Sequence, residues 1–234
     1  MKYNMIAALV IAGFTVSGIA APAMTSQIDK VSYSVGYEIG KGFKTQALPI
    51  EGPQFNTGFQ TGLSGTTPVM TEAEMQTTLA NFQKEMMQEV MAKQQAAAAT
   101  NLVASQAYLK KISAEAGVQQ IEPGLYYKVV KAGNGPMPLA TDTVTVNYEG
   151  SLINGTVFDS SYQRGQPASF QVSQVIPGWS KVLEQMPVGS TWMIYMSPDL
   201  AYGVSAPPQI GPNQALTFKI QLISTQKAAA QSNS

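Results

Sequence analysis

Two residue types that carry much of enzymatic proton transfer and nucleophilic catalysis are missing from this chain. Its 234 residues include no histidine and no cysteine. A disulfide, a thiolate nucleophile, a zinc site of Cys and His, a Ser-His-Asp triad and an imidazole proton shuttle are therefore excluded. The chemistry that is left belongs to carboxylates, hydroxyls and aromatic rings, among them ten Tyr and two Trp. We expect an enzyme built on this sequence to work without a metal ion or a cofactor.

The charges are few and balanced. Lys and Arg number 14 and Asp and Glu number 14, and charged residues make up 12% of the chain, about half the usual ~25%. Nucleic-acid binding depends on clustered positive charge, so a net charge of zero argues against nucleic acid as the main partner. The length allows one large domain, or one compact domain of about 100 residues with a more extended part.

Alternating residue patterns in the second half predict a sheet that would position any functional side chains there. The runs that are rich in Tyr, Val, Thr and Ile are 125–130, 143–149, 191–196 and 216–223. Asn154-Gly155 is a two-residue hairpin signal; Asn-Gly-Thr there is also a glycosylation sequon, but we favour the turn. One helix is expected after Pro177, and its apolar side would carry Trp179, Val182, Leu183 and Met186. We predict an α+β domain at 117–226, a curved antiparallel sheet around one short helix, followed by a disordered polar tail at 227–234.

The residues before this domain follow a helical pattern. Apolar side chains repeat with helical spacing in two short stretches of a region at 24–70, namely at Ile28, Val31, Val35 and Ile39 and at Phe55, Phe59 and Leu63. Each stretch also carries two glycines four residues apart, Gly36 and Gly40 in the first and Gly58 and Gly62 in the second. These glycines mark loops or let helices approach closely, and we favour close approach.

A long connecting helix is predicted at 71–116. Thr71 and Glu74 form a capping box, and neither proline nor glycine follows until Gly117. At about 1.5 Å per residue this helix would span roughly 65–70 Å. Its middle, 92–101, contains only Ala, Lys, Gln, Thr and Asn. We interpret that segment as a bare helical rod, with a flexible linker as the alternative.

The region at 24–90 is too small and narrow to bury its own phenylalanines and methionines. Chains of that size usually need a disulfide, a metal or a partner, and the first two are excluded. We therefore expect a homodimer through residues 24–90, with methionines filling an irregular shared core.

The first 23 residues are typical of an export signal. Lys2 precedes an apolar stretch at 5–19, and Ala21-Pro22-Ala23 offers the small residues that signal peptidase requires. We expect cleavage after Ala23, or otherwise after Ala20. A membrane-spanning helix is less favoured, because the stretch is shorter than the ~20 residues that a bilayer requires. The mature protein would have no integral membrane span and would lie in the periplasm or at the outer membrane or cell surface of a Gram-negative bacterium.

Several short strings occur in a fixed order along about 100 residues of the second half. They are Val-Asn-Tyr-Glu-Gly at 146–150, Gly-Thr-Val-Phe-Asp-Ser-Ser at 155–161, Val-Ile-Pro-Gly-Trp at 175–179 and Ser-Pro-Asp-Leu-Ala-Tyr-Gly at 197–203. With the final strand around Phe218, they resemble the FKBP-type peptidyl-prolyl cis-trans isomerases. The first half is similar to the macrophage infectivity potentiator-like branch of that family, in which an exported dimerisation domain and a long helix precede the isomerase.

This resemblance implies a site around a substrate proline. Its members would be Tyr148, Phe158, Asp159, Val175, Ile176, Trp179, Tyr202, Ile210 and Phe218. Trp179 would form the floor, with Tyr148, Phe158 and Phe218 as apolar walls. The backbone N–H of Ile176 and the hydroxyl of Tyr202 would bind substrate carbonyls, and Arg164 would be the charge partner of Asp159. Asp159, Tyr202 and Tyr148 would be the catalytic residues.

Two departures from the family pattern bear on substrate preference. Many members have phenylalanine where this chain has Ala168, so that wall should be thinner. Many also have histidine in the loop that reads Val-Ser-Ala-Pro-Pro at 204–208 here.

Two functions stay open at this point. The first is isomerisation of Xaa-Pro bonds in proline-containing polypeptides, which FKBP-directed macrolides would inhibit. An amide resists rotation by ~18–20 kcal/mol, and a dry apolar pocket with one or two aimed hydrogen bonds favours its twisted form without a nucleophile or base. The alternative is a non-enzymatic dimeric chaperone or adhesive scaffold that binds apolar, proline-containing segments. Aromatic residues on strands are more often core than site residues, so only their occurrence in family order favours the enzyme.

Overall fold

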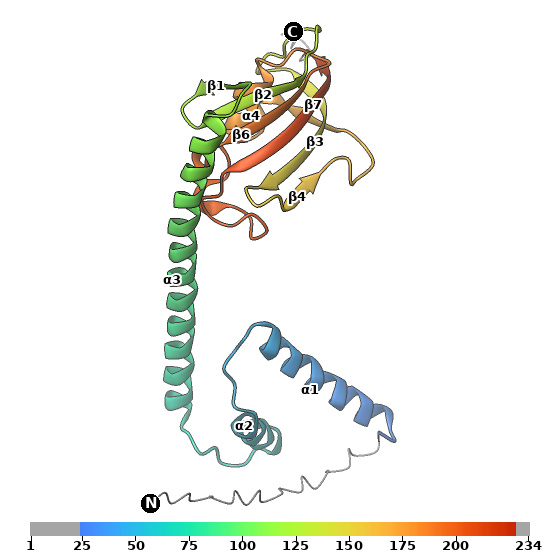
Figure 1. Cartoon of the computed structure of the whole chain (residues 1–234). Helices are drawn as coiled ribbons and strands as arrows, with labels where there is room; N and C mark the ends of the chain where they lie inside the picture. Colours follow the sequence, from blue (N-terminus) through green and yellow to red (C-terminus); the bar gives the residue numbers. More distant parts are fainter. Residues whose placement is uncertain (1–23, 228–234) are drawn as a thin grey trace, which may run out of the picture. The chain divides into compact units, whose positions relative to one another are not determined.

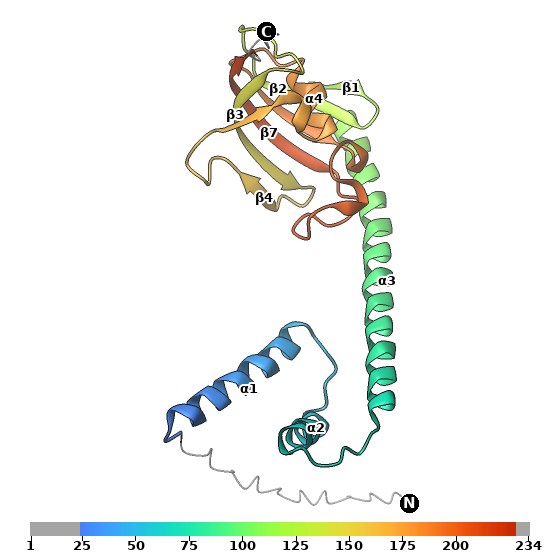
Figure 2. The ribbon, with the colours of Figure 1, turned by 180° about the vertical axis from the view of Figure 1, so that it is seen from behind.

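The computed structural model describes residues 24–227 (Figures 1 and 2). The expected signal peptide and residues 228–234 of the expected tail lie outside the described residues. The chain divides inside its longest helix, between Met75 and Gln76, into two compact units. No helix in the described range is both long and apolar enough to cross a membrane.

The first unit contains helices α1 (Gln27–Thr45) and α2 (Gly52–Ser64). α1 begins at a capping box, in which the Ser26 hydroxyl accepts from the Asp29 N–H at 3.1 Å and the Asp29 carboxylate accepts from the Ser26 N–H at 2.8 Å. The rings of Phe43 and Phe55 meet edge to face at 5.3 Å and join the two helices. Neither helix contains a buried residue.

The paired glycines of α1 and α2 make no close approach within the single chain. A Cβ atom added at Gly36, Gly40, Gly58 or Gly62 would meet nothing within 4 Å. The expectation that these glycines let helices cross is therefore wrong for the isolated chain, where all four face open space.

Helix α3 (Glu72–Ser113) is 42 residues long and unbroken, so the prediction of one continuous helix is confirmed. The predicted capping box closes its first turn, because the Glu74 carboxylate accepts from the Thr71 N–H at 2.8 Å and the Thr71 hydroxyl accepts from the Glu74 N–H at 3.2 Å. Residues 92–101 are helical with the rest of α3, so the flexible-linker alternative is wrong.

The second unit is an antiparallel sheet of seven strands, and the predicted α+β class is confirmed. The strands are β1 (Val118–Glu122), β2 (Leu125–Lys131), β3 (Thr143–Leu152), β4 (Val157–Ser160), β5 (Ala168–Gln171), β6 (Thr191–Met196) and β7 (Leu216–Gln226). Their order is β1-β2-β6-β7-β3-β4, and β5 pairs with β3. Asn154-Gly155 forms the predicted turn between β3 and β4, with Gly155 at a φ of +86° that favours glycine.

The main core lies between the sheet and the short helix α4 (Pro177–Leu183), which covers one face of the sheet (Figure 2). Trp179, Val182 and Leu183 of α4 are all buried. β3 alternates buried and partly exposed residues from Val144 to Gly150, as a strand with one face on a core should.

The last turns of α3 cover the opposite face of the sheet. Leu109 and Ile112 of α3 pack with Tyr195 of β6 and with Ala215. Ile194 and Met196, the residues on either side of Tyr195 in β6, face the main core. β6 is therefore enclosed on both faces, which explains why its side chains are nearly all apolar.

Candidate active site

A cavity of about 320 Å³ opens at the surface of the second unit, within the range of ordinary ligand sites. Four strands (β3, β4, β5 and β7), the start of α4 and two connecting segments supply its walls. The lining residues are Tyr148, Phe158, Asp159, Phe170, Gln174, Val175, Ile176, Trp179, Tyr202 and Phe218.

Trp179 forms the centre of the cavity's aromatic cluster. Pro177 begins α4, a favourable position because its fixed φ suits the first helical turn, and Trp179 follows two residues later with only 4% of its surface exposed. The rings of Tyr148, Phe170 and Phe218 stand nearly perpendicular to the indole, with centroids 5.1, 5.8 and 5.2 Å away. Edge-to-face contacts of this kind fix the rings more firmly than area burial alone.

A glycine allows two of the walls to meet. The rings of Phe158 and Phe218 contact each other at 90° with centroids 5.7 Å apart. A Cβ at Gly150 would lie 2.6 Å from Cε1 of Phe218 and 2.7 Å from Cζ of Phe158. Only glycine therefore fits beneath this pair of rings at that position of β3.

The polar side of the cavity is a closed trio of Tyr148, Asp159 and Arg164. The Tyr148 hydroxyl donates to one Asp159 carboxylate oxygen, and Nη1 of Arg164 donates to the other. Nη2 of Arg164 also donates to the Tyr148 hydroxyl at 2.8 Å, and the guanidinium carbon lies 5.4 Å from the Tyr148 ring centroid. Each Asp159 oxygen thus accepts a hydrogen bond inside the protein.

The protonation states of the trio follow from burial and from these bonds. Burial, followed by the hydrogen bond to Asp159, raises the pKa of Tyr148. Burial, followed by the negative charge of Asp159, raises the pKa of Tyr202. The hydrogen bonds to Tyr148 and then to Asp159 raise the pKa of Arg164. Both phenols are therefore neutral donors around pH 7, and Arg164 keeps its charge.

The hydrogen-bond donors at the cavity that are unused within the described chain include a backbone N–H and a phenol hydroxyl, besides the buried indole N–H of Trp179. Neither the backbone N–H of Ile176 nor the hydroxyl of Tyr202 donates to another residue in the range 24–227. Ile176 lies directly before α4, where its carbonyl accepts from the Trp179 N–H at 2.9 Å. The cavity thus combines a ring-lined base with two donors free to bind a ligand carbonyl.

Eight of the ten residues predicted from the sequence line this cavity. Arg164 adjoins it through Asp159 and Tyr148. Ile210 does not line it, because its side chain is 5% exposed and belongs to the main core.

The sequence prediction missed Phe170 and Gln174, which also line the cavity. Phe170 lies two residues after Ala168 on β5, and so on the same face of the strand. Its ring contacts both Tyr148 and Trp179, and supplies an aromatic wall next to the position where Ala168 implied a thin one. Alternation along β5 was the signal that could have identified it. Gln174 lies in a short 3₁₀ turn (Val172–Gln174), for which we find no sequence signal.

Clusters of His, Cys, Asp or Glu suited to a metal ion are absent from the described residues.

Comparisons with known proteins agree across the chain. Residues 135–223 match the family described as FKBP-type peptidyl-prolyl cis-trans isomerase, and residues 28–129 match the domain amino terminal to it. The chain is 46% identical to the outer membrane protein MIP of Legionella longbeachae, over 89% of this chain and 90% of that one. It is 47% identical to the peptidyl-prolyl cis-trans isomerase Mip of Coxiella burnetii, over 91% and 93%. The crystal structure of FkpA from Escherichia coli matches with a TM-score of 0.71 and 33% identity, over 88% of this chain and 100% of that one.

Proposed function

The chain belongs to the FKBP-type peptidyl-prolyl cis-trans isomerases, in their Mip-like branch, and we propose that its cavity isomerises Xaa-Pro bonds in exported polypeptides without forming a covalent bond. The observation that carries this proposal is the indole of Trp179, buried to 4% exposure beneath three perpendicular rings. A pyrrolidine ring is apolar and small enough to lie on such a base.

The substrate proline would lie over Trp179, between the walls formed by Phe158, Phe170 and Phe218. The free N–H of Ile176 and the hydroxyl of Tyr202 would each bind a substrate carbonyl. Val175 extends the apolar lining beside Ile176. The two donors fix how the peptide lies while leaving its Xaa-Pro bond free to turn.

Isomerisation would follow from the difference between the planar and the twisted amide. Resonance makes the planar amide more polar, so water stabilises it more than the twisted form. A ring-lined cavity lacks that solvation and favours the twisted form in relative terms, which is differential binding of the transition state. An uncatalysed Xaa-Pro bond takes tens to hundreds of seconds to isomerise, so a modest lowering of the barrier has a large effect on the rate.

Asp159 would act through its charge and its position rather than as a base. Both of its oxygens accept hydrogen bonds, from Tyr148 and from Arg164. The carboxylate would orient the Tyr148 ring against Trp179 and hold the positive charge of Arg164 beside the cavity. No step of this reaction requires a proton to leave the protein.

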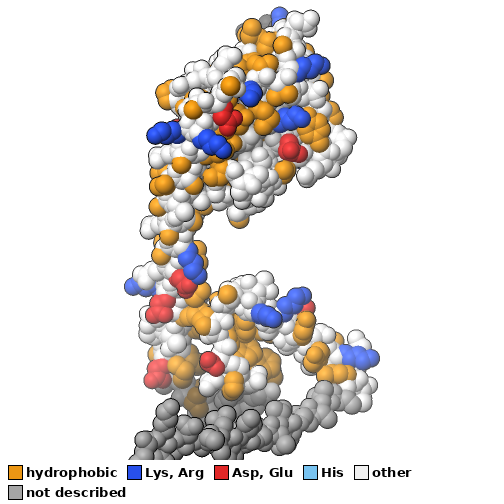
Figure 3. All heavy atoms as spheres, viewed as in Figure 1, with side chains coloured by type: hydrophobic (Ala, Val, Ile, Leu, Met, Phe, Trp, Pro, Cys, Tyr) orange, Lys and Arg blue, Asp and Glu red, His pale blue; other side chains and the backbone are white. Residues whose placement is uncertain are grey.

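Self-association of the first unit is the second part of the proposal. α1 and α2 contain no buried residue, and Ile28, Tyr33 and Leu63 are 61–70% exposed. Hydrophobic side chains appear at the surface over both helices in Figure 3. Apolar surface of this extent on a small unit favours an interface, and a second copy of the chain would cover it through residues 24–90.

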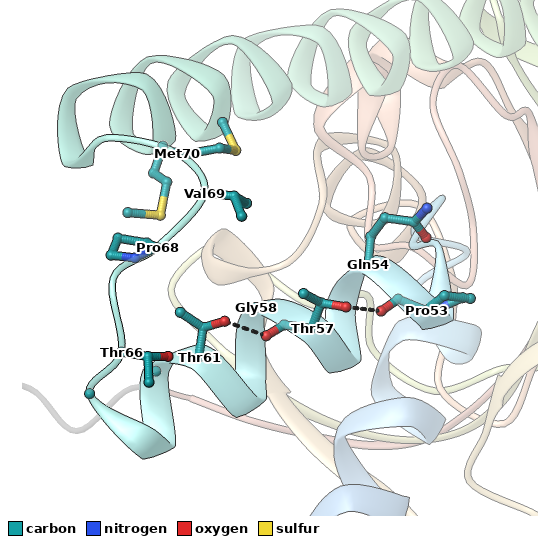
Figure 4. Close-up of a pocket in the computed structure, with 12 residues that line it drawn as sticks. Pro53, Gln54, Thr57, Gly58, Thr61, Thr66, Pro68, Val69 and Met70 are labelled. Atoms are coloured by element: carbon teal, nitrogen blue, oxygen red, sulfur yellow. Dashed lines mark hydrogen bonds between the residues drawn. The ribbon is translucent and has the colours of Figure 1, made fainter.

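A groove in the first unit supports this interface. It has a volume of about 610 Å³, and Figure 4 shows it between α2 and the segment that carries Pro68, Val69 and Met70. The hydroxyls of Thr57 and Thr61 donate to carbonyls of α2 itself, at 3.0 and 2.9 Å. This wall therefore needs no hydrogen-bond partner, and an apolar side chain of the second copy would fit.

We further propose that the chain is exported in a Gram-negative bacterium, either into the periplasm or to the outer membrane. The relative from Legionella longbeachae is named an outer membrane protein, which supports export. Fractionation of cells that produce the full chain tests the location, and protease treatment of intact cells separates surface display from the periplasm.

The test of function is a protease-coupled assay on an Xaa-Pro tetrapeptide, with and without an FKBP-directed macrolide. We expect faster isomerisation than in buffer alone, and the macrolide should abolish the increase because it would occupy the Trp179 cavity. Trp179→Ala serves as a second arm and should lose most of the activity. A wild-type chain that is folded but inactive on peptides, while it still delays aggregation of unfolded proteins, would support the scaffold instead.

A further inference from the structure

Helix α3 fastens a loop that connects two walls of the active-site cavity. This loop, residues 203–215, begins directly after Tyr202 and ends before β7, the strand that carries Phe218. We propose that Asn101 and Ser105 of α3 are positioning residues for isomerisation, acting on Tyr202 and Phe218 through this loop. The inference rests on the proposed function.

Three hydrogen bonds join the two α3 side chains to the loop. Nδ2 of Asn101 donates to the carbonyl of Pro212 at 2.8 Å. The hydroxyl of Ser105 donates to the carbonyl of Asn213 at 3.0 Å and accepts from the N–H of Ala215 at 2.7 Å. Two helical side chains therefore satisfy three backbone groups at the end of the loop.

Ser105 is an unusual residue for its place in the helix. It lies four and seven residues before Leu109 and Ile112, on the side of α3 that packs against the sheet, and it is fully buried. An apolar residue would be expected there, since a buried hydroxyl is costly unless it is bonded. By contrast, the hydroxyl of the exposed Ser113 donates within its own helix, to the carbonyl of Lys110. The burial of Ser105 is explained by its two bonds to the loop.

The loop transmits this attachment to both cavity walls. The N–H of Asn213 donates to the carbonyl of Gly203 at 2.9 Å, and Gly203 directly follows Tyr202. At the other end, Ala215 lies three residues before Phe218, and the hydroxyls of Tyr108 and Thr217 lie 2.8 Å apart. Asn213 has a left-handed backbone with a φ of +54°, and its side chain donates back to the carbonyl of Ala98 on α3 at 3.3 Å. One helix thus holds the residue that fixes the turn after Tyr202.

The first test uses the full chain with Ser105→Ala and Asn101→Ala. The matched controls are Ser113→Ala, whose hydroxyl bonds only within α3, and Thr100→Ala, which is exposed beside Asn101. Each variant is assayed at a temperature at which circular dichroism shows it fully folded. We expect kcat/KM for an Xaa-Pro peptide to fall about three- to tenfold in the two test variants, because small misplacements of binding groups are costly. The controls should stay within about twofold of wild type.

Asn101→Asp separates the hydrogen bond from the packing. It preserves the size of the side chain but replaces the amide donor with a carboxylate oxygen facing the carbonyl of Pro212. Its kcat/KM should be at least as low as that of Asn101→Ala. Equal activity of Asn101→Asp and wild type, with both folded, would overturn the proposal for Asn101.

Amide hydrogen exchange and NMR give a readout that does not depend on activity. In Ser105→Ala, exchange at Asn213 and Ala215 should accelerate at least about tenfold while strand β3 is unchanged, because only the loop opens locally. The amide signals of Tyr202 and Gly203 should shift in this variant and not in Ser113→Ala. Unchanged signals at Tyr202 and Gly203 together with unchanged kcat/KM would overturn the positioning role. If the wild-type chain has no isomerase activity, the proposed function is overturned instead. The exchange data would then still show whether Ser105 holds the loop at Asn213 and Ala215.

Discussion

The hydroxyl of Tyr148 donates a hydrogen bond to the carboxylate of Asp159 across the β3–β4 pair. The same phenol ring stands edge to face on Trp179, with centroids 5.1 Å apart. One side chain thus joins the polar trio to the apolar base of the cavity. A change at Asp159 should therefore alter the ring arrangement as well as the charge.

Replacing Asp159 tests this coupling. Asp159→Leu leaves the Arg164 guanidinium without its carboxylate and the Tyr148 hydroxyl without its acceptor. We expect kcat/KM for an Xaa-Pro peptide to fall about tenfold or more, equivalent to ~1.4 kcal/mol. Asp159→Asn is the matched control for charge, because it retains an acceptor for Tyr148, and it should be intermediate. Wild-type rates in both variants would remove Asp159 from the site.

Tyr202→Phe tests the second free donor. The change removes one hydroxyl that has no partner within the described chain, so the fold should be unaffected. Loss of a hydrogen bond to the substrate should lower kcat/KM about three- to tenfold, in line with ~0.5–1.5 kcal/mol for a neutral bond. Tyr162→Phe, at another partly exposed tyrosine outside the cavity, is the control and should be neutral. A stopped-flow assay on a tetrapeptide measures both.

Isomerisation should be independent of pH between about 6 and 9. The chain has no histidine, and burial raises the pKa of both Tyr148 and Tyr202 above the usual value near 10. Both phenols therefore keep their protons through this range. A bell-shaped rate profile with a midpoint inside it would contradict the mechanism, because it would require a proton transfer.

Stability should fall in alkali, from about pH 10 upward. Burial raises the pKa of Tyr148, Tyr195 and Tyr202 in the folded chain. Below about pH 10 both folded and unfolded chains keep these protons, so the stabilisation is fully present. Above it the unfolded chain loses protons that the folded chain retains, and the free energy of unfolding decreases with pH. Urea titrations at several pH values measure the slope, and a free energy that rises above pH 10 would contradict the assignment.

Gly150→Ala should damage the cavity and the fold together. The new methyl group would lie 2.6 Å from the Phe218 ring and 2.7 Å from the Phe158 ring, so these rings must move apart. Overpacking of this kind costs about 1–3 kcal/mol. We expect a lower Tm and a weaker macrolide affinity. Gly42→Ala in α1 is the control, since a Cβ there meets nothing within 4 Å, and it should lower neither quantity.

The parts of the structure that follow local patterns could be predicted from the sequence. Thr191–Met196 alternates between two cores and appears as β6 with the predicted bounds, and Thr71 and Glu74 cap α3. Contacts between segments that lie far apart in the sequence could not be predicted, because no local pattern encodes them. The sequence around Asn101 predicts the end of a bare rod, yet the Asn101 side chain donates a hydrogen bond to the carbonyl of Pro212, a residue 111 positions away. Ile210 has the residue type of a cavity wall, but the path of its loop turns it into the main core.

Phe59→Glu tests the proposed homodimer. Phe59 is 44% exposed on α2, and its ring stacks on Phe55 at 6.1 Å, so the substituted carboxylate would lie on the apolar surface of the first unit. A charge buried at an interface without a partner costs several kcal/mol. We expect analytical ultracentrifugation to show a dimer for the wild-type chain and a monomer for the variant at micromolar concentration. Tetrapeptide isomerisation should be the same in both, because the catalytic cavity lies wholly within residues 148–218. Gln60→Glu, which adds a charge at the next residue of α2, is the control and should remain dimeric if Phe59 faces the partner. If the Phe59→Glu variant remains dimeric, the dimer interface does not include Phe59.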